Sequence, residues 1–166
     1  GLEVKKFEGE IKKYLETKKS VICLNSGTAA LHLAIESILS KKKFEVLVPS
    51  ITYVSSFQAI TAAGGKPVIC DVTQDKVFID LEDAKKRISK NTLAIMPVHY
   101  ASDVSELEKV YKFAKKYKLR VIEDAAHSFG SMFNKEKVGN EGDIICFSFD
   151  GIKNITAGEG GAVVTA

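Results

Sequence analysis

The chain has 166 residues, of which 45% are hydrophobic and 27% are charged, and its net charge is +3. This length and composition are those of one globular domain with a sizeable core. The lysines are scattered among acidic residues, so no basic stripe indicates a nucleic-acid site, and no apolar segment approaches the ~20 residues that span a bilayer.

Helix and strand patterns alternate in the first half of the chain. Phe7, Ile11, Tyr14 and Leu15 recur at helical spacing, which predicts an amphipathic helix at the start. The elements expected after it are a strand over 20–25, a helix over 28–39, a strand over 44–50, a helix over 54–65 and a strand over 66–72.

The alternation continues in the second half. The sequence predicts a helix over 80–89, whose early acids and later bases suit the helix dipole. Lys135 and Lys137 are expected at a hairpin turn. The other expected elements are strands over 92–99 and 119–125, a helix over 104–118, and strands over 143–149 and 161–166.

The seven predicted strands are continuous apolar runs, and five of them are separated by helical patterns. Such runs are typical of strands that helices cover on both faces. We therefore predict an α/β fold, a three-layer α/β/α sandwich with a mostly parallel seven-stranded sheet. Because the sequence stops one residue after a strand, we expect 1–166 to be one domain of a longer protein.

The three cysteines, Cys23, Cys70 and Cys146, each lie in an apolar run, which predicts buried free thiols. Their spacing fits neither a disulfide framework nor a zinc site. The charged helix at the start carries no apolar signal-peptide core. These features predict a cytoplasmic protein that needs no metal.

Polar or ionisable residues follow five of the predicted strands. In an open α/β sheet, ligands bind beyond the carboxyl ends of the strands, so these residues are expected along one edge. They are residues 25–28, residues 50–53, His99 with Tyr100, residues 124–127, and Ser148 with Lys153.

Each of these residues also has a purely structural interpretation. The stretch 26–28 could cap a helix or bind an anion through the free N–H groups of that helix. Tyr53 could be a core residue or a platform for a ring, His127 could be a core histidine, and Ser148 could belong to a turn. Asp124 is harder to explain structurally, because a buried carboxylate is costly unless a cation or donor meets it.

The combination of these groups has a specific chemical meaning. A helix start for a phosphate, an aromatic face, a carboxylate for a pyridinium nitrogen and a lysine for an aldehyde are what a phosphorylated pyridine aldehyde requires. Lys153 stands alone in its loop, so it is either a surface charge like the other lysines or a buried amine with a chemical task.

At these residues the chain resembles the sugar aminotransferases of the DegT/DnrJ/EryC1/StrS family, pyridoxal 5'-phosphate enzymes of the aspartate-aminotransferase fold type. The resemblance covers nearly the whole chain in seven motifs in family order. They are NSGTAALHLAI, VPSITYVSSFQAI, PVICDV, MPVHY, VIEDAAHSFGS, VGNEGDIICFSF and KNITAGEGGAVVT.

The resemblance implies a role for each matching residue. Lys153 would form the Schiff base with the cofactor and then shuttle a proton. Asp124 would pair with the pyridinium nitrogen, Tyr53 would stack on the ring, and His127 would bond the ring hydroxyl. The residues implied to hold the phosphate are Gly27, Thr28 and Ser148.

The family also implies the reaction and its setting. Glutamate would donate the amino group and a nucleotide-linked keto-sugar would accept it, with ping-pong kinetics. The protein would be a homodimer with shared active sites, 1–166 would be its single cofactor-binding large domain, and a C-terminal small domain would be absent from this chain. The last strand would run antiparallel. One departure is ASDVSEL after His99 and Tyr100, where many members have glycine and proline, and it leaves the sugar preference open.

Three alternatives compete with transamination. A sugar dehydratase on the same fold carries histidine in place of the lysine, and Lys153 argues against it. A non-catalytic regulatory or scaffold relative should lack Lys153 or Asp124, and the chain has both. A dinucleotide-binding domain is disfavoured because no strand is followed by Gly-x-Gly-x-x-Gly.

Overall fold

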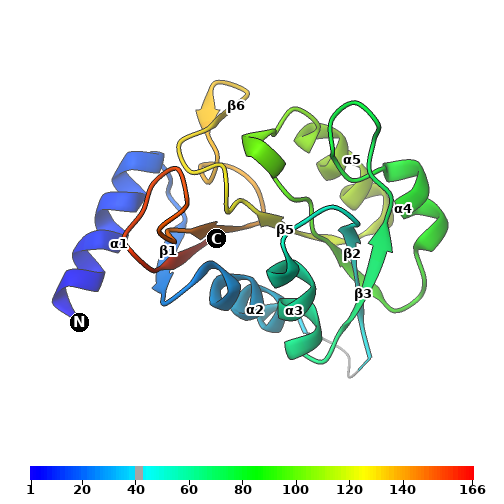
Figure 1. Ribbon diagram of the computed structural model, residues 1–166, viewed down its shortest axis with the longest axis horizontal. Helices are drawn as coiled ribbons and strands as arrows, with labels where there is room; N and C mark the ends of the chain where they lie inside the picture. Colours follow the sequence, from blue (N-terminus) through cyan, green and yellow to red (C-terminus); the bar gives the residue numbers. More distant parts are fainter. Residues whose placement is uncertain (40–42) are drawn as a thin grey trace.

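The computed structural model describes residues 1–39 and 43–166, and the strands of this part form one large sheet and one hairpin (Figure 1). The hairpin consists of β6 (Met132–Phe133) and β7 (Glu136–Lys137). The strands of the large sheet are β1 (Ser20–Leu24), β2 (Glu45–Pro49), β3 (Lys66–Cys70), β4 (Thr92–Ile95), β5 (Arg120–Asp124), β8 (Ile144–Ser148) and β9 (Gly161–Thr165).

The large sheet is mostly parallel, as predicted. Its strand order is β1-β9-β8-β5-β4-β2-β3, and the pairs β2 with β3, β2 with β4, β4 with β5 and β5 with β8 are all parallel. The last strand, β9, lies between β1 and β8 and runs antiparallel to both. The carboxyl ends of the other six strands therefore meet at one edge of the sheet.

Helices cover both faces of the sheet. Successive strand residues point to opposite faces, so the helices that contact neighbouring residues lie on opposite sides of the sheet. Val46 and Val48 pack with α2 and α3, whereas Leu47 between them packs with α4 and α5. Val164 packs with α1 on the same side as Leu47. This arrangement confirms the three-layer α/β/α sandwich. The helices are α1 (Leu2–Leu15), α2 (Gly27–Ser37), α3 (Val54–Ala62), α4 (Leu81–Arg87) and α5 (Leu107–Tyr117), with a short 3₁₀ turn η1 (Tyr100–Ser102).

Every predicted element is present, but several end earlier than expected. The strand predicted over 92–99 ends at Ile95, because Pro97 has no N–H to donate to a neighbouring strand, and Val98 forms only an isolated bridge with Asp124. The helix predicted over 54–65 ends at Ala62. The predicted hairpin is formed by β6 and β7, with Lys135 in its turn, but Lys137 lies in strand β7 and not in the turn.

The described cysteines are free thiols, as predicted, but they are not equally buried. Cys70 and Cys146 lie in the core, and burial raises the pKa of Cys70 to about 11. Cys23 is only half-buried, so its predicted full burial is wrong, because β1 is an edge strand with less cover. In the described part of the chain, none of the helices has the length and apolar character needed to cross a membrane.

Candidate functional site

A cavity of about 410 Å³ opens at the edge where the parallel strands end. Its walls come from the start of α2, the loops after β2 and β5, the end of β8 and the loop that follows β8. All seven site residues predicted from the sequence line this one cavity. They are Gly27, Thr28, Tyr53, Asp124, His127, Ser148 and Lys153.

The start of α2 forms one wall of the cavity. Ser26 caps the helix, since its Oγ accepts a hydrogen bond from the N–H of Ala29 at 3.1 Å, which confirms the capping interpretation. The first N–H groups of a helix have no intrahelical acceptor, so the same geometry favours an anion. A Cβ on Gly27 would lie 2.7 Å from the Cβ of Ser148, so only glycine lets the helix start approach β8 this closely.

Asp124 is the buried charge of the site, with only 4% of its surface exposed. Its Oδ2 accepts a hydrogen bond from the Ser56 hydroxyl at 2.7 Å, and its Oδ1 accepts one from the N–H of Ala126 at 3.3 Å. Within residues 1–39 and 43–166 the carboxylate forms no ion pair. Because an isolated buried charge is costly, Asp124 is suited to a cationic group brought into the cavity.

Tyr53 and Lys153 enter the cavity from two different loops. Tyr53 precedes the first turn of α3 and is 70% exposed, which rules out the alternative that it is a core residue. Lys153 is half-buried, and in the described part of the chain its amine makes no ion pair. Its backbone N–H donates to the carbonyl of Asp150 at 3.0 Å, which holds the loop in a turn.

His127 lies close enough to Lys153 for the positive charge of that lysine to affect the pKa of the imidazole. Partial burial lowers the pKa of His127 below its ordinary value of 6.5, the positive charge of Lys153 lowers it further, and Asp124 acts in the opposite direction. The His127 ring also lies 6.0 Å from the ring of Tyr100, centroid to centroid. His127 therefore favours the neutral imidazole, which can donate one hydrogen bond and accept another.

The lowered pKa of His127 predicts how the stability of the cofactor-free protein depends on pH. The unfolded chain takes up the proton first, so stability should fall as the pH drops below about 6.5 and level off once the folded histidine is also protonated. His127→Gln should remove this part of the pH dependence. Urea denaturation of the wild type and His127→Gln at several pH values between 5 and 8 checks this prediction. If the free energy of unfolding depended on pH equally in the two proteins, the prediction would be contradicted.

The turn after His99, where the resemblance leads us to expect glycine and proline, is strained. Ala101 has φ 51° and ψ 31°, and Ser102 has φ 66°, values that favour glycine. The φ of Ser102 also excludes proline, which requires about −65°. The Ser102 hydroxyl donates a hydrogen bond to the carbonyl of His127, so this turn contacts the backbone of a predicted site residue.

Ala101→Gly should stabilise the protein by about 0.5–1 kcal/mol, because glycine removes the left-handed strain at a smaller cost in unfolded-chain entropy. Ala63→Gly is the matched control: Ala63 has an ordinary φ of −74°, so glycine there should destabilise the protein. Chemical denaturation measures both changes. A loss of stability in Ala101→Gly as large as in the control would contradict the strain.

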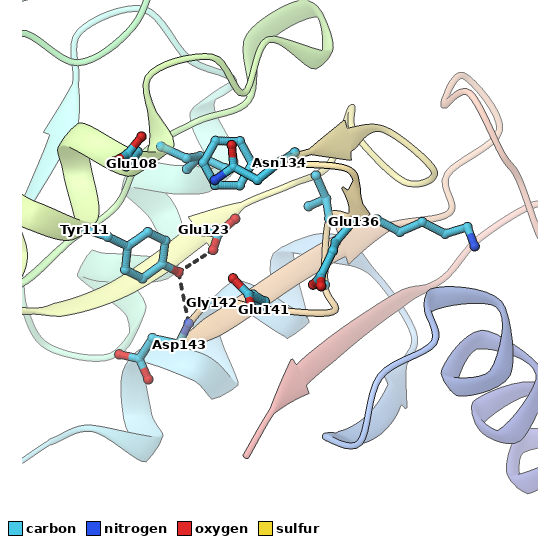
Figure 2. Close-up of a pocket in the computed structure, with 13 residues that line it drawn as sticks. Glu108, Tyr111, Glu123, Asn134, Glu136, Glu141, Gly142 and Asp143 are labelled. Carbon is cyan, nitrogen blue, oxygen red and sulfur yellow. Dashed lines mark hydrogen bonds between the residues drawn. The ribbon is translucent and has the colours of Figure 1, made fainter.

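A second, larger cavity of about 530 Å³ contains none of the predicted site residues. Figure 2 shows Tyr111 between Glu123 and Asp143: its hydroxyl donates to Glu123 and accepts from the Asp143 N–H at 2.9 Å. Burial, followed by the charge of Glu123, raises the pKa of Tyr111, so the phenol stays protonated. Glu123 also lies 3.2 Å from Nε2 of buried His99. The Tyr111 contacts satisfy the buried Glu123 carboxylate and the Asp143 N–H, whereas Nε2 of His99 lies beside Glu123 and forms no hydrogen bond with the described residues.

The sequence profile of the DegT/DnrJ/EryC1/StrS aminotransferase family matches residues 1–166. GDP-perosamine synthase of Vibrio cholerae is 37% identical over 165 residues, which are 99% of this chain and 45% of that protein. The chain thus spans about half the length of the curated relatives it matches.

Solved structures agree with this match. DesV of S. venezuelae, solved in complex with a ketimine intermediate, superposes with a TM-score of 0.92 and 34% identity over 99% of this chain and 44% of that one. The ntda protein of Bacillus subtilis, solved with bound cofactor PMP, superposes with a TM-score of 0.89 and 29% identity over 98% of this chain and 36% of that one.

Proposed function

Because the chain belongs to the DegT/DnrJ/EryC1/StrS aminotransferase family, we propose that the whole protein is a pyridoxal-phosphate-dependent aminotransferase. It moves an amino group from glutamate to a keto-sugar carried on a nucleotide. One observation carries the proposal: a single cavity holds the amine of Lys153 and the buried carboxylate of Asp124, and neither forms an ion pair with any of the described residues.

The residues that line the cavity fit pyridoxal phosphate. The N–H groups at the start of α2 and the hydroxyl groups of Thr28 and Ser148 suit the phosphate. The exposed ring of Tyr53 suits a flat aromatic ring, and Asp124 suits a protonated ring nitrogen. When bound, the cofactor supplies an electron sink for the pair released when a proton leaves the substrate carbon.

Each ionisable residue then has a definite task. Lys153 would hold the aldehyde carbon of the cofactor through Nζ. Once free, its amine would move a proton at the substrate carbon, first as a general base and then as a general acid. Asp124 would favour a protonated ring nitrogen, and neutral His127 would donate a hydrogen bond to the ring oxygen.

The substrates and the assembly are proposed from the relatives. The similarity to GDP-perosamine synthase supports a nucleotide-linked sugar as one substrate. Both half-reactions share one cavity, which supports ping-pong kinetics. The part of the protein outside 1–166 contributes a small domain to the substrate pocket, and a second copy completes each site of a homodimer. Free thiols favour the cytoplasm, where they stay reduced.

Reduction with borohydride tests the proposal directly. The full-length protein with pyridoxal phosphate should be yellow, and borohydride should fix the cofactor on the peptide that contains Lys153. The same protein should convert a nucleotide keto-sugar to an amine when supplied with glutamate. A folded dimer that stays colourless and carries no adduct would disprove the proposed function.

A further inference from the structure

Asp124 is held in place by a side chain from another part of the chain. The hydroxyl of Ser56, on the first turn of α3, lies 2.7 Å from Oδ2 of Asp124, although the two residues are 68 positions apart. Ser56 has no exposed surface, and neither α3 nor β5 needs this contact for its own backbone hydrogen bonds. The bond therefore joins two elements at the floor of the cavity.

A second hydroxyl extends this contact to the cavity wall. Oγ1 of Thr52 lies 2.8 Å from Oγ of Ser56, and Thr52 lines the cavity beside Tyr53. An ionised carboxylate only accepts hydrogen bonds, and a hydroxyl has one hydrogen to give. Ser56 thus donates to Asp124 and accepts from Thr52. The carboxylate of Asp124 therefore sets the direction of both hydrogen bonds, from Thr52 to Ser56 and from Ser56 to Asp124.

We propose that Ser56 and Thr52 are positioning residues for the reaction and orient the Asp124 carboxylate toward the ring nitrogen of the cofactor. This inference rests on the proposed function. Both oxygens of Asp124 already have a donor, Ser56 on one and the Ala126 N–H on the other, so the carboxylate cannot rotate freely.

The hydroxyl chain also links two predicted contacts of the cofactor ring. Tyr53 precedes α3 and its carbonyl accepts from the N–H of Ser56 at 3.2 Å, so Tyr53 and Ser56 belong to one turn. A shift of that turn would move the aromatic face and the Asp124 carboxylate together. Hydrogen bonds to a charged group are stronger than neutral ones. Loss of the Ser56 donor should therefore weaken cofactor binding.

The test uses the full-length protein and four single variants. Ser56→Ala should weaken the equilibrium binding of pyridoxal phosphate about tenfold and lower kcat by a similar factor, with little change in KM for either substrate. Thr52→Val should have a smaller effect in the same direction, and Thr52→Ser, which keeps the hydroxyl, should restore wild-type values. Thr61→Val is the matched control, because among the described residues its hydroxyl bonds the carbonyls of Phe57 and Gln58 within α3 and none outside that helix.

Cofactor binding and unfolding together separate the possible outcomes. In the cofactor-free protein, the effects of Ser56→Ala and Asp124→Ala on the unfolding equilibrium constant should be non-additive by about fivefold. Wild-type cofactor affinity and kcat in Ser56→Ala, or additive effects in this cycle, would overturn the positioning role and leave the proposed function standing. Failure of the wild type to bind pyridoxal phosphate would overturn both.

Discussion

Lys153→Ala should abolish transamination, with a fall in turnover of at least about 10³-fold, because it removes both the covalent attachment and the proton shuttle. The variant should also lose the yellow colour of the bound cofactor and the borohydride adduct. Its stability should change little, since the half-buried Lys153 side chain makes no ion pair within the described residues. Absorption spectra, peptide mapping and steady-state rates on the full-length protein check these results.

Lys85→Ala is the control for this experiment. Lys85 is an exposed lysine on α4, and no residue of α4 lines the cavity, so the variant should keep colour, adduct and turnover. Full turnover in Lys153→Ala would show that the amine of Lys153 is not the catalytic group.

Asp124→Asn should have two opposite effects. Turnover should fall about 10³-fold, because the ring nitrogen loses the anion that keeps it protonated. The cofactor-free protein should gain about 1 kcal/mol of stability, since a buried carboxylate that forms no ion pair with the described residues becomes a neutral amide of the same shape. Amide atoms can still bond the Ser56 hydroxyl, so the fold is kept. Kinetics and urea denaturation measure the two effects separately.

Asp143→Asn is the matched control, because that carboxylate does have a cation. Arg120 binds it with two hydrogen bonds of 2.6 Å, so the amide there should lower stability and leave turnover nearly unchanged. If Asp124→Asn destabilised the cofactor-free protein as Asp143→Asn does, the carboxylate of Asp124 would stabilise the fold itself and would not be a binding group for a cationic ligand.

The elements of this protein could be predicted from local patterns. Continuous apolar runs mark its buried parallel strands, and helical spacing marks α1 and α5. Because parallel strands end at one edge, polar residues such as Asp124 and Ser148 could be assigned to one cavity before any contact was known. Element ends were less predictable, as β4 shows at Pro97, because they depend on donors and acceptors in neighbouring strands.

The sequence by itself determined the α/β class, the order of the elements and seven of the residues that line the cavity, since each depends on residues close together in the chain. Only the tertiary structure decided that β9 lies inside the sheet, that Gly27 touches Ser148, and that Ser56 donates to Asp124. Those contacts join residues tens of positions apart, and no local pattern encodes them. They arise when helices from separate crossovers pack on one sheet, which brings the start of α3 against the end of β5.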